Sequence, residues 1–313
     1  MSNAHLGTSR RRKCDEYYTL YSDVERELRY YSPLLRGRSI YCNCDGKDSA
    51  FLKYFLSNFE GLGLKRLVVT GYNPSGCGFY CEYDAFNKLV MKPLSGSGSF
   101  DSDECRAILG EIDIVVTNPP FSLFRSFFNM LVESGKDFLL VAPTTCYTYA
   151  DVFPLLMEGR VRAGVNELKN FLSPRDITSG SVIGISGSEL VKTIGTTCWV
   201  TTLSFDMRYR RRINWSRRYS PERYPRFDNF DAIDVKHIKN LPIDYTGLIG
   251  ISLRYILFHN PNDYELLGVN INEESMEGLR AFYDDASVRY ENFKLNGKDL
   301  FNRLIIRRKS PFV

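Results

Sequence analysis

The chain has 313 residues, of which 43% are hydrophobic and 25% are charged, and its formal net charge is +4. This length allows a sizeable core in one or two domains, and the composition excludes a disordered or fibrous protein. No apolar run approaches the ~20 residues that a membrane span requires, and no signal peptide is visible, so no membrane partner is expected. The eight cysteines are scattered along a chain too large to need a disulfide framework, which predicts a reducing, cytoplasmic location.

The first part of the chain predicts a basic tail and then the opening of an α/β fold. Residues 1–13 end in Arg-Arg-Arg-Lys and are expected to be disordered, and apolar residues at helical spacing predict a helix over 20–31. A strand is expected over 39–44, a turn over 45–49 and a helix over 51–59. A doubly wound fold opens its first nucleotide pocket with such a strand, turn and helix, although the usual glycine-rich fingerprint is absent here.

The next stretch predicts further strands and a hairpin. A second strand is expected over 65–70, and weak alternation over 76–92 predicts a hairpin inserted into the fold. Residues 95–99 read as a glycine-serine linker or turn, Phe100 is expected to end a short third strand, and a helix follows over 103–109.

An apolar, β-branched run at 112–117 is the most informative stretch of the chain. It predicts a strand buried on both faces, the kind found in parallel sheets. Asn-Pro-Pro-Phe follows at 118–121, and the prolines end the strand because they have no N–H for the ladder. Asn118 and Phe121 are therefore expected at the carboxyl end of a strand, where open α/β sheets bind their ligands.

After this motif the alternation of helix and strand continues. A helix is expected over 124–131, a strand over 138–142 and a further helix over 149–157, which together predict a parallel, doubly wound sheet. A β-rich run at 197–205 would complete this sheet. The glycine- and serine-rich stretch at 180–195 predicts a mobile loop near the substrate.

Basic residues are concentrated between Met207 and Arg226, a window with eight arginines and a single acid, Glu222. The window carries +7, so the rest of the chain sums to −3. Arginines interleaved with aromatic residues suit phosphate contacts, base-edge hydrogen bonds and stacking, whereas the simpler interpretation is a solvated face. The candidate nucleic-acid contacts are Arg208, Arg210, Arg211, Arg212, Arg217, Arg218 and Arg226.

The motif at 118–121 is also the signature loop of methyltransferases that modify exocyclic amines of bases. Such an amine is a poor nucleophile, because its lone pair is delocalised into the ring. The side-chain oxygen of Asn118 and the main-chain carbonyl of Pro119 can each accept one of its N–H groups, with Pro120 stiffening the backbone. Phe121 would stack on the base. The alternative is an ordinary Asn-Pro turn.

Together these stretches resemble the EcoRI-type adenine-specific DNA methyltransferases, and the resemblance runs in order along most of the chain. Its landmarks are 15–19 (Asp-Glu-Tyr-Tyr-Thr), 41–45 (Tyr-Cys-Asn-Cys-Asp), 78–80 (Gly-Phe-Tyr), 116–125, 224–233 (Tyr-Pro-Arg-Phe-Asp-Asn-Phe-Asp-Ala-Ile) and 244–247 (Asp-Tyr-Thr-Gly). The resemblance implies a Rossmann-like catalytic domain over 14–206 and a DNA target-recognition region over 207–313. It also implies site-specific N6-methylation of a flipped-out adenine in duplex DNA, with S-adenosylmethionine as donor and S-adenosylhomocysteine as product.

The resemblance also assigns a cofactor site. Tyr18 and Thr19 would line the methionine end of the cofactor, and Asp45 in the first turn would be its polar anchor. Tyr72 and Asn73, just after the second strand, are candidates for the ribose or adenine. The full set of candidate cofactor residues is Tyr17, Tyr18, Thr19, Asn43, Cys44, Asp45, Ser49, Tyr72, Asn73, Phe100 and Asn118. The chain departs from the family pattern in the turn at 46–49 and at Ser99, where an acid would be expected near the adenine.

The expected protein is a bacterial or phage-encoded monomer, with a restriction endonuclease as a possible functional but not physical partner. Two alternatives stay open. The same loop chemistry could act on RNA adenine or on a protein glutamine amide, or the chain could be a DNA-binding protein with a decayed cofactor pocket. No metal is expected, because Cys42 and Cys44 lie within one strand and point to the same face, and no histidine lies near them or Cys77 and Cys81.

Overall fold

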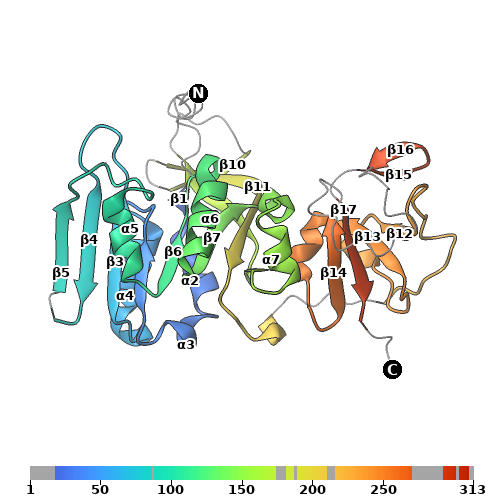
Figure 1. Ribbon diagram of the computed structural model, residues 1–313, viewed down its shortest axis with the longest axis horizontal. Helices are drawn as coiled ribbons and strands as arrows, with labels where there is room; N and C mark the ends of the chain where they lie inside the picture. The colour runs from blue at the N-terminus through green and yellow to red at the C-terminus, as the bar shows by residue number, and fades with distance from the viewer. Residues whose placement is uncertain are drawn as a thin grey trace. The chain divides into compact units, whose positions relative to one another are not determined.

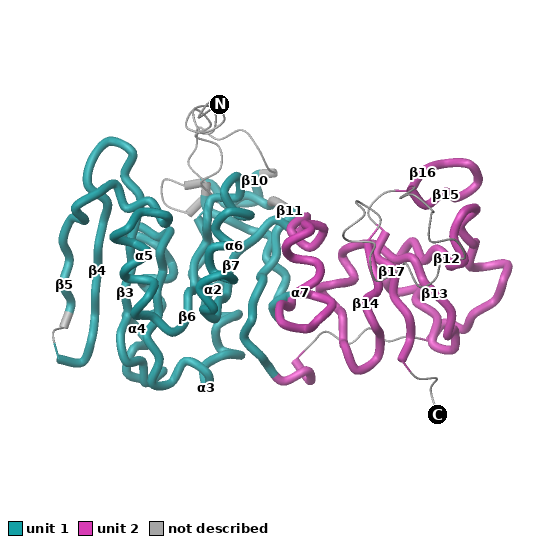
Figure 2. The backbone as a smooth tube through the Cα atoms, viewed as in Figure 1, with its two compact units in different colours: residues 1–143, 163–205 teal, residues 144–162, 206–313 magenta. Residues whose placement is uncertain are grey.

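The computed structural model describes residues 18–86, 88–173, 181–186, 189–209, 216–269, 292–300 and 303–309. The chain divides into two compact units, residues 1–143 with 163–205 and residues 144–162 with 206–313 (Figure 2). Within the described ranges, no helix has the length and apolar character needed to cross a bilayer. The predicted tail, Tyr17 and three of the candidate arginines (Arg210, Arg211 and Arg212) lie outside the described residues.

A large mixed β-sheet forms the centre of the first unit (Figure 1). Its strands are β1 (Tyr18–Thr19), β2 (Ser39–Cys42), β3 (Arg66–Gly71), β4 (Phe79–Asp84), β5 (Lys88–Pro93), β6 (Ile114–Thr117), β7 (Asp137–Pro143), β8 (Arg162–Ala163), β9 (Leu168–Ser173), β10 (Ser181–Ser186) and β11 (Glu189–Thr201). The strand order is β1-β9-β11-β7-β6-β2-β3-β4-β5, and β8 and β10 also pair with β11.

The four central strands of this sheet, β7, β6, β2 and β3, are parallel as predicted. At both edges the sheet is antiparallel, where it departs from the predicted parallel, doubly wound pattern. On one side the predicted hairpin of β4 and β5 joins the sheet, with β4 antiparallel to β3. The connections from β3 to β4 and from β4 to β5 are too short for the crossover that parallel strands need. On the other side β11 pairs antiparallel with β7, and β9 and β1 continue the antiparallel pattern.

Helices cover both faces of the parallel strands. The helices are α2 (Tyr21–Leu28), α3 (Ser32–Leu35), α4 (Ala50–Leu62), α5 (Asp103–Gly110), α6 (Phe124–Ser134) and the 3-10 turn η1 (Phe121–Leu123). Residues of α2, α3 and α4 share one core cluster with Ile40 and Cys42 of β2. On the opposite face the Cys105 thiol of α5 contacts the Thr70 hydroxyl, and Phe128 of α6 packs edge-on against Phe138 at 5.5 Å. Successive residues of a strand point to opposite faces, which is how one strand serves both layers.

The helix ends follow from local chemistry. The Ser49 hydroxyl accepts the Leu52 N–H at 3.1 Å, and the Ser102 hydroxyl accepts the Cys105 N–H at 3.3 Å, so each serine caps its helix. Helix α4 ends at Gly63, whose φ of 64° is the left-handed conformation that favours glycine.

Three predicted elements differ in the structure. Phe100 does not end a strand, since 94–100 is irregular and its amides at Ser95 and Gly96 are bound by the Glu104 carboxylate. The helix expected over 149–157 is only α7 (Phe153–Met157), preceded by a 3-10 turn, η2 (Thr144–Thr148), because Pro154 is tolerated only in a first helical turn. The prediction of a loop over 180–195 was wrong for the described residues there, because Ser181–Ser186 form β10 and pair antiparallel with Glu189–Thr193 of β11, which satisfies backbone groups whatever the side chains.

The second unit is built on a four-stranded sheet in the order β12-β13-β17-β14. Its elements are β12 (Ala232–Val235), β13 (Leu248–Ser252), β14 (Tyr264–Val269), β15 (Phe293–Leu295), β16 (Lys298–Leu300), β17 (Arg303–Arg308), η3 (Met207–Tyr209), η4 (Ile238–Asn240) and η5 (Leu253–Phe258). Phe293 stacks on Phe227 and Phe230, with ring centroids 5.0 and 4.9 Å away. The Phe227 ring lies so close to Gly250 that a Cβ there would be 2.4 Å from it.

Candidate active site

The carboxyl ends of β2, β3 and β6 are tied together by the turn that follows β2. The Asp45 amide donates to the Thr70 carbonyl of β3 at 3.0 Å, and the Cys44 amide donates to the Thr117 hydroxyl of β6 at 3.2 Å. The Thr117 hydroxyl in turn donates to the Asp45 carboxylate at 2.6 Å. The structure therefore brings the first turn and the Asn-Pro-Pro-Phe loop to the same edge of the sheet, where α/β folds bind ligands.

The Asp45 carboxyl is almost completely buried at this edge. Burial raises its pKa to about 7, because the charged form is poorly solvated there, while hydrogen bonds from the Thr117 and Ser49 hydroxyls act in the opposite direction. A carboxyl whose pKa is near neutrality changes its charge readily when a cation approaches. The Asp45 carboxyl can therefore take up a negative charge when a cation binds at this edge of the sheet.

Asn43, the residue directly after β2, has a buried side-chain amide. It is 1% exposed, and neither its nitrogen nor its oxygen has a hydrogen-bond partner within the part of the chain that the structure describes. An unsatisfied buried amide costs about 1–3 kcal/mol per group, so native structures rarely keep one without a use. The amide offers one donor and one acceptor to a polar ligand at the carboxyl end of β2.

The Asn-Pro-Pro-Phe loop begins directly after β6. Asn118 is partly buried and Pro119 is buried, and Phe121 opens η1 with its ring against the core cluster. The amide nitrogen of Asn118 donates to the Thr19 hydroxyl of β1 at 3.3 Å. This contact fixes the orientation of the amide, because its nitrogen faces Thr19 and its oxygen faces away. Residues separated by 99 positions thus meet in one site, with Tyr18, 44% exposed, beside them.

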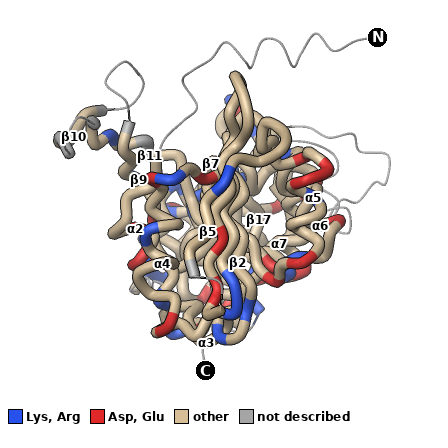
Figure 3. The backbone as a smooth tube through the Cα atoms, turned by 90° about the vertical axis from the view of Figure 1, so that its left-hand side faces the viewer, with Lys and Arg blue, Asp and Glu red and all other residues tan. Residues whose placement is uncertain are grey.

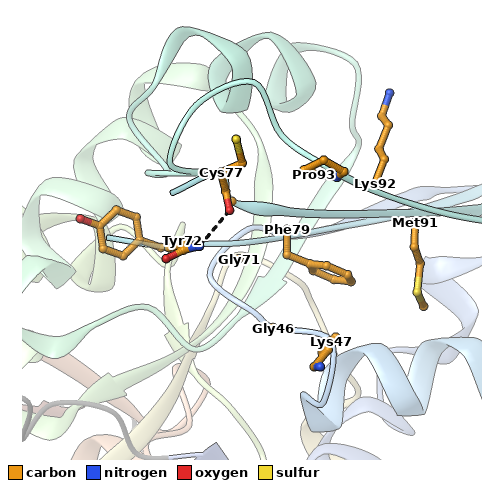
Figure 4. Close-up of a pocket in the computed structure, with 11 residues that line it drawn as sticks. Gly46, Lys47, Gly71, Tyr72, Cys77, Phe79, Met91, Lys92 and Pro93 are labelled. Atoms are coloured by element: carbon orange, nitrogen blue, oxygen red, sulfur yellow. Dashed lines mark hydrogen bonds between the residues drawn. The ribbon is translucent and has the colours of Figure 1, made fainter. Parts of the chain in front are cut away.

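A cavity of about 540 Å³ borders the turn that follows β2 (Figure 4). Gly46 and Lys47 of the first turn line it together with Tyr72 and Asn73, which follow β3. The remaining walls come from the hairpin, and in Figure 4 Phe79 and Met91 point to the Lys47 side while Lys92 points away. The Asn73 side chain donates to the Cys77 carbonyl at 3.1 Å and accepts the Ser75 N–H at 3.0 Å, which holds the rim of the cavity in place.

Other candidate residues lie away from the cavity lining. Phe100 is 8% exposed and packs edge-on against Phe127 at 5.0 Å, so its ring belongs to the core between α5 and α6. Ser99 donates to the carboxylate of Asp101, so an acid lies next to the position where one was expected. Burial raises the pKa of the Cys44 thiol well above its usual range, so this thiol stays protonated.

Glu27 was not among the residues predicted to shape the site. This side chain of α2 is fully buried, and its carboxylate accepts hydrogen bonds from the amides of Val165 and Asn166, the Asn166 side chain and the Tyr31 hydroxyl, at 2.7 to 2.9 Å. It joins α2 to the segment before β9, and β9 pairs with β1 through Phe171 and Thr19. The one available signal was an acid within the apolar face of the predicted helix at 20–31.

Several arginines of the second unit have acidic neighbours. Arg208 pairs with Asp206 at 2.5 Å, Arg218 with Asp244 at 3.9 Å, and Arg226 with Asp231. Among the described residues Arg217 forms no ion pair and is exposed. In the view of Figure 3, basic and acidic residues are both scattered along the backbone. The structure brings none of these arginines into the cavity lining.

The chain is similar in sequence to known proteins along nearly its whole length. The family described as "Adenine-specific methyltransferase EcoRI" matches residues 5–309. The Type II methyltransferase M.EcoRI of Escherichia coli is 34% identical, over 98% of this chain and 97% of its own length. The Type II methyltransferase M.MpnI of Mycoplasma pneumoniae is 32% identical, over 99% of each chain, and no solved structure matches significantly. The resemblance predicted from the motifs is confirmed, and the chain belongs to the EcoRI family of adenine-specific methyltransferases.

Proposed function

We propose that this protein transfers a methyl group from S-adenosylmethionine to the N6 amine of an adenine flipped out of duplex DNA at a specific sequence. The proposal is carried by two contacts at the carboxyl end of β6. Asn118 contacts Thr19, and the preceding residue, Thr117, contacts Asp45 in the turn after β2. The same turn follows Asn43, whose buried amide has no hydrogen-bond partner among the described residues. Membership of the family supports the reaction class. The parallel core with helices on both faces supports a Rossmann-like fold for the catalytic unit.

The residues at the sheet edge fit the cofactor chemically. S-adenosylmethionine supplies an electrophilic methyl group, and its methionine end carries an ammonium and a carboxylate. Asp45 is the residue assigned to the ammonium, and the orphaned amide of Asn43 supplies a donor and an acceptor nearby. The cavity beside Tyr72 and Asn73 is the proposed place of the adenosine, with Phe79 and Met91 as apolar walls.

The Asn-Pro-Pro-Phe loop performs the chemistry on the base. The Asn118 side-chain oxygen and the Pro119 carbonyl accept the two N–H groups of the amine, which draws the nitrogen lone pair out of conjugation with the ring. The amine would then attack the methyl group of bound S-adenosylmethionine, so that an N–CH3 bond forms as the S–CH3 bond breaks. The electron pair of that bond would stay on sulfur, giving S-adenosylhomocysteine, and the proton released by the amine would pass to solvent. Phe121 stacks on the extruded base and offsets part of the few kcal/mol that flipping costs.

Transfer of tritium-labelled methyl groups tests the substrate class. Duplex DNA from a methylation-free host should accept label into N6-methyladenine, and unlabelled duplex DNA should compete while RNA and glutamine-containing protein should not. Label in RNA or protein alone would overturn the DNA assignment. Tight cofactor binding without transfer to any of the three would favour a decayed enzyme.

Cofactor affinity is expected to depend on pH through Asp45. The pKa of this carboxyl is about 7 in the free protein, and a bound ammonium favours its ionised form. Affinity should therefore weaken as pH falls below 7, by up to about tenfold per pH unit. Calorimetric titration between pH 5.5 and 8.5 measures this slope. Asp45→Asn should flatten it, whereas Asp48→Asn in the exposed part of the same turn should leave it unchanged.

Arg217 should contribute more to DNA affinity than Arg208. Arg208 is already paired with Asp206, whereas Arg217 forms no ion pair among the described residues. Arg217→Ala should weaken binding to all sequences alike and reduce the slope of log affinity against log salt by about 1. Fluorescence anisotropy over a salt series measures both variants. An unchanged slope in Arg217→Ala would remove this residue from the DNA contacts.

A further inference from the structure

Two stretches that the resemblance singled out, 224–233 and 244–247, meet in the second unit around Arg226. The Arg226 guanidinium forms an ion pair with the Asp231 carboxylate and donates to the Tyr245 hydroxyl at 3.4 Å. Neither stretch has a part in the proposed cofactor site or in the chemistry of the Asn-Pro-Pro-Phe loop. Their contact in one cluster therefore needs an explanation of its own.

The guanidinium of this cluster is held in a defined orientation. Arg226 forms a β-bridge with Ile233, which fixes its backbone. The Tyr245 ring that receives its second contact is itself held on two sides. Its centroid lies 4.5 Å from that of the Tyr219 ring, and a Cβ on Gly247 would be only 2.5 Å from its hydroxyl oxygen. The direction in which Arg226 presents its remaining N–H groups is thus set before any ligand binds.

The exposed polar residues of the same segment divide into two kinds. The Asp228 carboxylate accepts two amides from the turn between β15 and β16, at 3.2 and 2.7 Å, and the Asn229 side chain accepts an amide of β15 at 2.8 Å. These two residues hold the fold together. The side chains of Arg226 and Asp231 are instead 47% and 86% exposed. An ion pair so exposed contributes little to stability, so the pair is better explained by a ligand that approaches from solvent.

We propose that Arg226 and Asp231 together read a G·C base pair in the major groove of the DNA. This inference rests on the proposed function, in which duplex DNA is the substrate. In the major groove, guanine presents two acceptors, O6 and N7, which a guanidinium binds with two N–H groups. Cytosine presents its N4 amine, which a carboxylate accepts. The neighbouring donor and acceptor of the protein pair therefore match the neighbouring acceptors and donor of that base-pair edge.

A backbone phosphate is the other DNA group that a guanidinium binds, and Asp231 argues against it. Its carboxylate lies against Arg226 and would repel a phosphate placed there. Arg217, which is exposed and forms no ion pair among the described residues, is the better phosphate contact. The edge of a G·C pair has no net charge and offers both acceptors and a donor, so it suits both members of the pair.

Binding to modified duplexes tests this assignment. The recognised motif is first obtained by mapping N6-methyladenine, and fluorescence anisotropy then compares the motif duplex with duplexes that carry 7-deazaguanine at one guanine at a time. This base lacks the N7 acceptor but keeps its pairing with cytosine. At one guanine the replacement should weaken binding by the intact protein roughly tenfold, the loss of a hydrogen bond to a charged group. In Arg226→Met the same replacement should change affinity less than twofold, because the donor is already absent.

The matched control is Arg160→Met, which removes another exposed arginine of the same unit, paired with Glu158 at 3.4 Å. It should keep the tenfold effect of 7-deazaguanine. Asp231→Ala should reduce the preference for that G·C pair over an A·T pair at the same position. A folded Asp231→Ala protein with the full preference would show that the two residues do not read the pair together, which overturns the inference.

The remaining outcomes separate this inference from the proposed function. A motif without guanine, or an intact protein indifferent to 7-deazaguanine at every guanine, would overturn the inference even if Arg226→Met failed to fold. So would an Arg226→Met protein that binds all duplexes more weakly but keeps the tenfold effect, since that is the behaviour of a phosphate contact. A complete lack of N6-methyladenine in the DNA would instead contradict the proposed function.

Discussion

Asn118→Ala should lower the rate of methyl transfer by about 10³-fold or more while leaving cofactor affinity within about twofold. The Asn118 oxygen is proposed to interact with the amine most strongly as that amine becomes a nucleophile, so its loss removes stabilisation of the transition state rather than of the bound cofactor. Single-turnover transfer of labelled methyl groups to duplex DNA measures the rate, and calorimetry measures the affinity.

A suitable control is Asn58→Ala, which removes an asparagine whose side chain donates to the Tyr54 carbonyl of its own helix. It should transfer methyl groups at close to the wild-type rate. Asn118→Ala with a tenth of wild-type activity would show that the amide is not the acceptor. A large loss of cofactor affinity in that variant would move Asn118 from the base to the cofactor.

Glu27→Ala should destabilise the first unit by about 3–5 kcal/mol, the cost of leaving the partners of a buried charge unsatisfied. The substitution removes the hydrogen-bond acceptor of four buried donors, which then have no water to bind. They are the backbone amides of Val165 and Asn166, the Asn166 side chain and the Tyr31 hydroxyl. It also removes the link between α2 and the segment leading to β9, on which β1 and Thr19 depend. Urea unfolding followed by circular dichroism measures the change in free energy.

The same helix offers a control for this prediction. Glu25 of α2 is exposed, and Glu25→Ala should change the free energy of unfolding by no more than about 0.5 kcal/mol. Glu27→Gln should fall between the two, because its amide keeps one acceptor oxygen but turns a donor toward groups that also donate. If Glu27→Ala were as stable as Glu25→Ala, the carboxylate would not hold these segments together.

The local sequence pattern was sufficient to predict elements whose conformation depends mainly on their own residues. The β-branched run before Asn118 predicted β6, and the alternation at 76–92 predicted the hairpin of β4 and β5. The same local reasoning failed where composition conflicts with pairing. Glycines and serines at 180–195 suggested a loop, but β10 and β11 pair antiparallel there, because backbone hydrogen bonds between strands do not depend on side-chain composition.

The candidate site depended on contacts that no local pattern contains. Asn118 and its partner Thr19 are 99 residues apart, and Thr19 is positioned through the pairing of β1 with β9. The same holds for Glu27 and Val165, which are 138 residues apart. Helical spacing at 20–31 could show that Glu27 faces the core, but it could not show which amides it meets.

The central claim is that the Asn118 loop methylates adenine N6 in DNA, and one measurement tests it most directly. The protein and its Asn118→Ala variant would each be expressed in a methylation-free host, and N6-methyladenine would be mapped across the host DNA by long-read sequencing. The proposed function predicts one sequence motif modified throughout the DNA with the wild-type protein and none with the variant. Unmodified DNA in both hosts, despite folded protein that binds S-adenosylmethionine, would contradict DNA as the substrate.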